Sequence, residues 1–229
     1  IGLCEKGPNV LVFPEGACYC HVTEGDVAEI VTEHLVKGRI VTRLLQKDGE
    51  DNRAATSLSE TRFYKHQFRI ALRNCGVINP ESIDEYLGAD GYTALERILT
   101  EQTPPQDIID CVKKSGLRGR GGAGFPTGNK WQFTHDAVSE DGVKYVCCNA
   151  DEGDPGAFMD RSVLEGDPFS VIEAMTIAGY AIGASQGYIY IRAEYPIAVK
   201  RLQLAISQAR SYGLLGKNIL DSGFSFDLE

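Results

Sequence analysis

The most informative part of the sequence is glycine-rich and basic: Ser115-Gly-Leu-Arg-Gly-Arg-Gly-Gly-Ala-Gly-Phe-Pro-Thr-Gly-Asn-Lys-Trp131. Six of the 25 glycines of the chain lie between Gly116 and Gly128, and the segment 113–130 holds five basic residues and no acidic one. Glycine lets backbone amides approach a ligand closely and permits positive φ. In a chain of formal charge −9, this local reversal of charge favours a phosphate as ligand. We therefore expect a loop that cradles a phosphate or a flavin, with a structural turn as the alternative.

The surroundings of this loop differ from two common phosphate-binding motifs. Gly119–Gly124 satisfies G-x-G-x-x-G, but the dinucleotide fingerprint needs a strand before it and a helix after it. Here the pattern predicts a preceding helix that begins at Pro104-Pro105, and Phe125-Pro126 follows the loop. No Gly-Lys-Ser/Thr closes it, which excludes a P-loop. A flexible linker is disfavoured because large apolar residues such as Trp131 are costly in solvent.

A second informative loop follows the apolar run Lys144–Cys148, which is typical of a strand. The run leads into Asn149-Ala-Asp-Glu-Gly-Asp-Pro-Gly156, and ligand groups of open α/β folds lie at strand ends. Such side chains can hold the hydroxyl and ring-edge N–H groups of a nucleotide-like ligand. Two alternatives remain open: a Ca²⁺ site, although the EF-hand spacing is absent, and a solvated acidic turn.

The rest of the second half alternates between helix and strand patterns, which predicts the α/β class with a parallel or mixed sheet. We expect a helix over Asp167–Ile182, a strand over Gly187–Arg192, a helix over Pro196–Tyr212 and a strand within Asp221–Glu229. Before the glycine-rich loop, the pattern predicts helices over Glu60–Asn74, Pro80–Leu87, Gly91–Leu99 and from Pro105 to Lys114.

The first 45 residues read as part of a small α/β domain. Strands are expected over Asn9–Phe13 and Ala17–Val22, followed by a helix from Asp26 to Gly38. One hairpin and one helix bury too little surface for a core of their own, so we expect the last half of a domain. The expected organisation is a partial domain over 1–45, a linker and helical segment over 46–112, and a partial ligand-binding domain over 113–229.

Composition excludes several classes of protein. A charge of −9 and a pI near 5.0 argue against nucleic acid as the main partner. No apolar run reaches the roughly 18 residues of a membrane span. Seven cysteines at irregular spacing, without a secretory signal, favour a reducing, cytoplasmic setting. No C-x2-C pair is present, and Cys18 and Cys20 are at best half a metal site and are better explained as small buried residues.

The two loops together resemble a known family. The motif S-G-L-R-G-R-G-G-A-G-F-P-T-G-x-K-W, followed by C-N-A-D-E-x-x-P-G, is similar to the flavin-bearing, NADH-oxidising subunit of respiratory complex I and its soluble relatives. The resemblance covers about Phe63 to Glu229 and implies the front part of the complex-I-type FMN-binding α/β domain. Asp154, where the respiratory enzymes usually carry Glu, looks more like the soluble branch of NAD(P)-linked, often electron-bifurcating, iron-only hydrogenases and NAD-linked formate dehydrogenases.

The resemblance also implies cofactors and the residues that bind them. Hydride would pass between NAD(P)H and flavin N5, with one-electron steps to iron–sulfur clusters, so no side chain need act as a general acid and no catalytic residue is assigned. The residues implied for NAD(P)H are Phe125, Lys130 and Asp154. The residues implied for FMN are Gly119, Arg120, Gly121, Gly122, Lys130, Asn149, Asp151 and Glu152.

The beginning of the chain resembles the end of a thioredoxin-like [2Fe-2S] ferredoxin module. In that alignment Cys4 is the final cluster ligand and the other three precede Ile1, while the [4Fe-4S] ligands of the family and a second flavin loop follow Glu229. We therefore expect a portion of a longer subunit, with a thioredoxin-like ferredoxin subunit and a hydrogenase or formate dehydrogenase catalytic subunit as partners. The alternatives are a subunit of complex I, a non-catalytic structural or assembly subunit, and a simple ferredoxin-type electron carrier.

Overall fold

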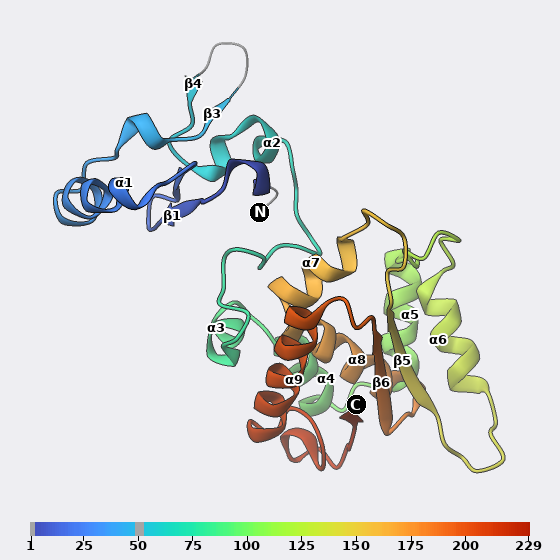
Figure 1. Ribbon diagram of the computed structural model, residues 1–229. Coiled ribbons are helices and arrows are strands. Elements are labelled where there is room, and N and C mark those ends of the chain that lie inside the picture. Colours follow the sequence, from blue (N-terminus) through green and yellow to red (C-terminus); the bar gives the residue numbers. More distant parts are fainter. Residues whose placement is uncertain (1–2, 49–52) are drawn as a thin grey trace. The chain divides into compact units, whose positions relative to one another are not determined.

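The chain forms two compact units, residues 1–70 and 71–229. The computed structural model describes residues 3–48 and 53–229, apart from the side chains of Cys4, Asp48 and Arg53 (Figure 1). Helices and small sheets occur together, so the predicted α/β class is confirmed. No helix in the described part of the chain is both long and apolar enough to cross a membrane.

Unit 1 is built on a short antiparallel hairpin of β1 (Val10–Val12) and β2 (Ala17–Tyr19). Helix α1 (Glu24–Glu29) follows and continues as the π-helical segment η2 (Ile30–Val36), so the predicted hairpin and helix are present. The segment expected as a solvated linker begins with a second antiparallel pair, β3 (Lys47–Asp48) and β4 (Arg53–Ala54). The remaining elements are short: η1 (Cys4–Lys6), η3 (Thr42–Leu44), η4 (Leu58–Glu60) and α2 (Arg62–Lys65).

Tyr19 is the centre of the core of unit 1. Its hydroxyl accepts the backbone N–H of Val41 at 3.0 Å and lies 2.6 Å from Nδ1 of His34. The hydroxyl thus joins β2, η2 and the segment before η3. The apolar residues around it are Val12, Ala17, Val22, Ile30, Val41, Leu44 and Leu45.

One apolar face of unit 1 is open. The helical spacing places Val27, Val31 and Leu35 beside the buried Ile30 and His34, yet the first three are exposed. They line a groove of about 340 Å³ together with the residues of β1. The pattern therefore identified the helix correctly, but only part of its apolar stripe is buried in the core.

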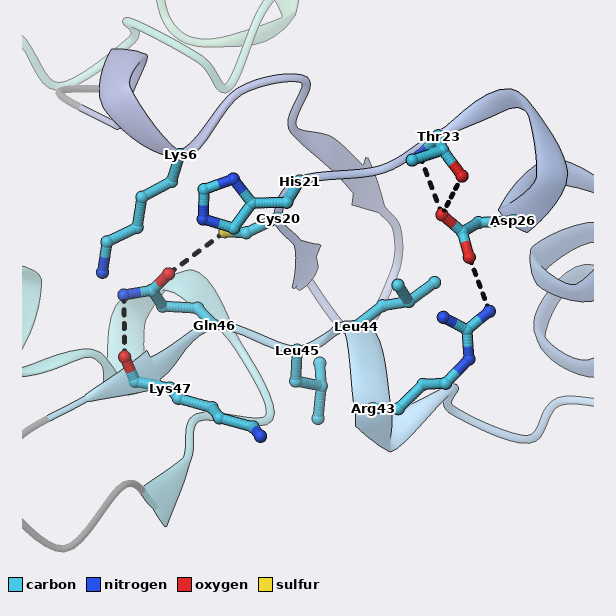
Figure 2. A pocket seen from close by; sticks show the side chains of 10 residues that line it. All are labelled: Lys6, Cys20, His21, Thr23, Asp26, Arg43, Leu44, Leu45, Gln46 and Lys47. Carbon is cyan, nitrogen blue, oxygen red and sulfur yellow. Dashed lines mark hydrogen bonds and ion pairs between the residues drawn. The ribbon is translucent and has the colours of Figure 1, made fainter.

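A polar cavity of about 600 Å³ lies on another side of unit 1 (Figure 2). Within it the Cys20 thiol donates to Oε1 of Gln46 at 3.1 Å, and Nε2 of Gln46 donates to the Lys47 carbonyl at 3.1 Å. Cys18 and Cys20 are both buried, as expected for small core residues. Burial, followed by the neighbouring Cys20, raises the pKa of the Cys18 thiol to about 12, so this thiol stays protonated at neutral pH.

Asp26 lines the same cavity and makes unit 1 sensitive to acid (Figure 2). Its carboxylate accepts the Thr23 hydroxyl at 2.6 Å and the Thr23 N–H at 2.8 Å at the start of α1, and it pairs with Arg43 at 2.6 Å. These contacts, the Thr23 hydroxyl first, lower the pKa of Asp26 to about 2.

An Asp in an unfolded chain has a pKa of about 3.9, so the folded state binds fewer protons between that value and about 2. We therefore expect the stability of unit 1 to fall as the pH drops through this interval. Urea unfolding at several pH values should show a smaller loss in Asp26→Asn than in the unchanged protein. Equal acid sensitivity of the two proteins would contradict this assignment.

Unit 2 is built on a parallel sheet in the order β5 (Tyr145–Ala150), β6 (Gln186–Ile191) and β7 (Asp227–Leu228). The long helices α8 (Pro168–Ile182) and α9 (Pro196–Ser211) make the connections and pack together, with the shorter α7 (Met159–Gly166) after β5. These strands and long helices agree with the predicted alternation. The predicted strand in 221–229 is shorter than expected: Asp221 ends the 3₁₀ turn η5 (Ile219–Asp221), and residues 222–225 are in neither a helix nor a strand.

Three of the four helices predicted before the glycine-rich loop are present as α3 (Ile83–Gly88), α4 (Thr93–Thr100) and α5 (Pro105–Ser115). The predicted helix Glu60–Asn74 is wrong, since only the turn α2 is helical there. Its apolar residue Phe68 is 91% exposed, so no core surface supports a longer helix. Asn74 instead donates to the buried carboxylate of Asp167 at 2.8 Å.

The helices that precede the loop share one core with the sheet. The buried carboxylate of Glu173 in α8 accepts the Tyr86 hydroxyl of α3 at 2.6 Å and the Tyr92 N–H before α4 at 2.9 Å. Tyr86 also stacks on Phe169 at the start of α8. Residues 71–112 are therefore part of the same compact unit as the loop that follows them.

Gly128 permits a close approach of α5 to the next helix, α6 (Thr127–Asp136). A Cβ at this position would lie 2.6 Å from Cγ and 2.7 Å from the backbone nitrogen of Lys113.

Backbone atoms cannot move aside cheaply, so we expect Gly128→Ala to lose about 1–3 kcal/mol of unfolding free energy. Gly88→Ala in α3 is the matched control, because the added Cβ meets no atom within 4 Å. Equal midpoints of thermal unfolding for Gly128→Ala and Gly88→Ala would show that Gly128 is not needed for the close approach of α5 to α6.

Candidate functional site

The glycine-rich loop is closed at its base by backbone pairing. Arg118 lies opposite Pro126 in an antiparallel bridge, the Gly119 N–H donates to the Phe125 carbonyl at 2.8 Å, and the Thr127 N–H donates to the Leu117 carbonyl at 2.9 Å. Helix α6 begins directly after Pro126. The expectation that no helix follows the loop is therefore wrong, while the preceding element is the helix α5 as predicted.

The tip of the loop, residues 120–124, presents backbone N–H groups and open space. None of these five N–H groups donates a hydrogen bond to another described residue. Gly122 and Gly124 have φ of +100° and +60°, and a Cβ at Gly121, Gly122 or Gly124 would meet nothing within 4 Å. Successive free N–H groups at a turn with positive φ form an anion-binding concavity.

Positive charge is added beside this tip. Lys130 lies exposed in the first turns of α6, near the end of the helix that carries the positive pole of the backbone dipole. The two arginines fold back on the loop itself: Nη1 of Arg118 donates to the Gly124 carbonyl at 3.1 Å, and Arg120 donates to the Arg118 carbonyl. The donor set of the loop thus fits a phosphate group.

The acidic loop follows β5, where Asn149 has its side chain exposed. Oδ1 of Asn149 accepts the N–H of Asp151 at 3.1 Å, which leaves the amide NH₂ of Asn149 available. Asp154 is exposed further along this loop. In Figure 1 the loop between α5 and α6 and the loop between β5 and α7 lie at the same end of the unit. Within the described chain no hydrogen bond joins these two loops.

Glu152 differs from the other acidic residues because its carboxylate is already engaged. It accepts the N–H groups of Asp160 at 2.9 Å and Arg161 at 3.1 Å at the start of α7, and the Tyr195 hydroxyl at 3.2 Å. Partial burial acts to raise the pKa of Glu152, but these three donors outweigh it and hold the pKa below its usual range. Glu152 is therefore ionised and fixed at neutral pH.

Aromatic surface beside the loops extends beyond Phe125, the one ring that the sequence had singled out. Phe125 is 44% exposed and its ring centre lies 6.4 Å from that of Phe133, which is 64% exposed. Phe133 follows Lys130 by three residues on α6. Residues at this spacing lie on the same face of a helix, so the sequence could have shown this neighbour if the helix had been recognised. On the sheet, the rings of Tyr145 and Tyr188 lie 5.9 Å apart, so the exposed face of β5 and β6 is also aromatic.

The described part of the chain contains no group of three or more His, Cys, Asp or Glu residues arranged to hold a metal ion. The Cys4 side chain lies outside the described residues, so its role as a cluster ligand stays a prediction.

Comparison with known proteins agrees with this geometry. Residues 112–223 match the family described as the Nuo51 FMN-binding domain. The chain is 60% identical over 172 residues to HndC, a subunit of the NADP-reducing hydrogenase of Solidesulfovibrio fructosivorans, and the match covers 75% of this chain and 34% of that protein. It is 55% identical over 147 residues to an NADH-quinone oxidoreductase subunit of Aquifex aeolicus, and this match covers 64% of this chain and 33% of that protein.

A likeness of fold extends further along the chain. The crystal structure of an NAD⁺-reducing [NiFe]-hydrogenase in the H2-reduced state aligns with 97% of this chain and 33% of that one, with a TM-score of 0.52 and 24% identity. The chain thus spans about a third of the length of the relatives it matches. Residues 112–223, which contain both loops, are similar to the Nuo51 FMN-binding domain, and the two relatives are named as subunits of an NADP-reducing hydrogenase and of an NADH-quinone oxidoreductase.

Proposed function

We propose that this chain is the FMN- and NAD(P)H-binding part of a flavoprotein subunit in a soluble, cytoplasmic, multi-subunit oxidoreductase that serves an iron-only hydrogenase. The observation that carries the proposal is the row of unpartnered N–H groups at residues 120–124, within the described chain, beside Lys130 and the start of α6. The 60% identity to a subunit named for an NADP-reducing hydrogenase supports the hydrogenase context.

The charges of the two loops indicate which end of FMN each loop would bind. The phosphate would bind Arg120, Gly121, Gly122 and Lys130, where the free backbone donors and positive charge gather. Gly119 would also contact FMN, although its N–H already donates to the Phe125 carbonyl. Carboxylates repel phosphate, so Asn149, Asp151 and Glu152 would face the sugar or ring end of FMN. The Glu152 carboxylate already accepts from the Asp160 and Arg161 N–H groups and from the Tyr195 hydroxyl, so the chain itself limits how a ligand can bind to it.

The nicotinamide nucleotide would lie between Phe125, Lys130 and Asp154. Phe125 offers an exposed ring for stacking, and Phe133 extends the same aromatic surface. Bound FMN would supply the exchange of hydride with NAD(P)H and the passage of single electrons to iron–sulfur clusters. The residues of this chain bind and orient the two cofactors, and we assign no proton transfer to any of them.

The finer domain description belongs to the same proposal. Residues 1–45 would be the C-terminal half of a thioredoxin-like [2Fe-2S] domain with Cys4 as a cluster ligand, and residues 113–229 would be the front part of the flavin domain. The segment 46–112 would join the two. The other [2Fe-2S] ligands and the [4Fe-4S] ligands would lie outside these 229 residues. A thioredoxin-like ferredoxin subunit and a hydrogenase subunit would be the partners.

The second candidate function uses the same chemistry in another complex: the chain would be part of a NADH dehydrogenase-type subunit of a formate dehydrogenase or of complex I. The 55% identity to a subunit named for an NADH-quinone oxidoreductase favours this candidate. A non-catalytic structural or assembly subunit is the candidate of another class. Flavin binding separates it from the other two, because such a subunit has no need of a flavin.

The first experiment removes the positive charge beside the loop. In the full-length subunit, Lys130→Ala should raise the dissociation constant of FMN about tenfold or more, because a charged partner of the phosphate is lost. FMN would be titrated into flavin-depleted protein and followed by quenching of its fluorescence. Lys200→Ala, an exposed lysine on α9, is the control and should bind FMN as the unchanged protein does. Unchanged affinity in Lys130→Ala would refute the proposed phosphate site.

The second experiment concerns the nucleotide. Asp154→Glu lengthens the side chain by one methylene and should tighten the contact to NADH, which lowers KM for NADH several-fold without changing the affinity for FMN. Steady-state kinetics of the assembled complex would measure KM, and a fluorescence titration would measure the affinity for FMN. An identical KM in the two proteins would count against a nucleotide contact at Asp154.

A further inference from the structure

Glu152 is held in a backbone conformation that residues other than glycine seldom adopt. Its φ is +43°, in the left-handed region, where a side chain carries a conformational cost. Such a conformation persists only where surrounding contacts over-determine it. Those contacts come from two places: the start of α7 and the connection between β6 and α9.

The connection between β6 and α9 contributes Arg192 and Tyr195. Nη1 of Arg192 donates to the backbone carbonyl of Glu152 at 2.8 Å, and the Tyr195 hydroxyl lies 3.2 Å from the Glu152 carboxylate and 3.3 Å from the Ala157 carbonyl. The backbone and the side chain of Glu152 are thus bound by two residues that lie 40 and 43 positions further along the chain.

Contacts other than the one to Glu152 hold Tyr195 in position. It is 4% exposed, and the guanidinium carbons of Arg161 and Arg192 lie 5.4 and 5.3 Å from its ring centre. Cation–π contacts of this kind hold the ring in one orientation. The hydroxyl is therefore pre-positioned at the acidic loop and does not need the ligand to order it.

We propose that Tyr195 and Arg192 are positioning residues of the flavin site: they hold Glu152 in its left-handed conformation and so set the course of the acidic loop from Asp151 to Gly156. This inference rests on the proposed function. Neither residue needs to touch the flavin. Their effect is to keep Asn149 and Asp151 at the ligand and to hold the Glu152 carboxylate in one orientation.

The test uses the full-length subunit in its complex and the variant Tyr195→Phe. Phenylalanine keeps the ring beside the two arginines and removes only the hydroxyl. We expect the dissociation constant of FMN to rise about tenfold, as for the loss of one hydrogen bond to a charged group. At saturating FMN, kcat should return to that of the unchanged protein, because positioning is lost and chemistry is not.

Tyr212→Phe is the matched control at the other end of α9. The Tyr212 hydroxyl donates to a carboxylate oxygen of Asp84 at 2.7 Å, so the same kind of bond is removed. Flavin affinity should be unchanged in this variant. Arg192→Lys is a second test, since lysine keeps the charge but loses the planar donor set, and it should also weaken flavin binding.

Unchanged FMN affinity in Tyr195→Phe and Arg192→Lys, or an equal loss in Tyr212→Phe, would overturn the inference. A saturated Tyr195→Phe complex that stays inactive would also overturn it, because a general structural defect would then explain the loss. If the unchanged protein binds no FMN at all, the proposed function fails, which is a different result from equal binding by all variants.

Discussion

The site depends on how the backbone between α5 and α6 satisfies its own hydrogen bonds. Arg118 and Arg120 donate their side-chain N–H groups to carbonyls of the loop, and the N–H groups of residues 120–124 are left without partners among the described residues. Positive φ at Gly122 and Gly124 makes that arrangement possible. A loop with donors outward beside the start of a helix is an anion site before any ligand arrives.

The rest of unit 2 keeps this loop in place. The close contact of Gly128 with Lys113 fixes α6 against α5, and both helices also pack against α8. Glu173 joins α8 to the earlier helices through Tyr86 and the Tyr92 N–H. Because α8 also packs on the sheet, the loop and the strand that delivers Asn149 belong to one framework. Loops supported in this way are pre-organised, which reduces the entropy lost on binding.

Much of this fold could be predicted from the sequence, because glycine spacing, local charge and apolar periodicity are local signals. Helix α6 was missed because only Phe125-Pro126 was considered after the loop, although proline is common at the beginning of helices. The helix expected over 60–74 is wrong because Phe68 has no core surface to cover. The contacts that hold Glu152 could not be predicted, because its partners lie 8, 9, 40 and 43 residues away and only the fold brings them to its carboxylate and backbone.

The central claim is that the two loops together form a flavin site that exchanges electrons with a nicotinamide nucleotide. The most direct measurement is the visible absorbance of the full-length subunit in its complex, recorded without oxygen before and after addition of NADH or NADPH. We expect a flavin spectrum that bleaches when one of these nucleotides is added. A complex without flavin absorbance, or with a flavin that neither nucleotide bleaches, would contradict it.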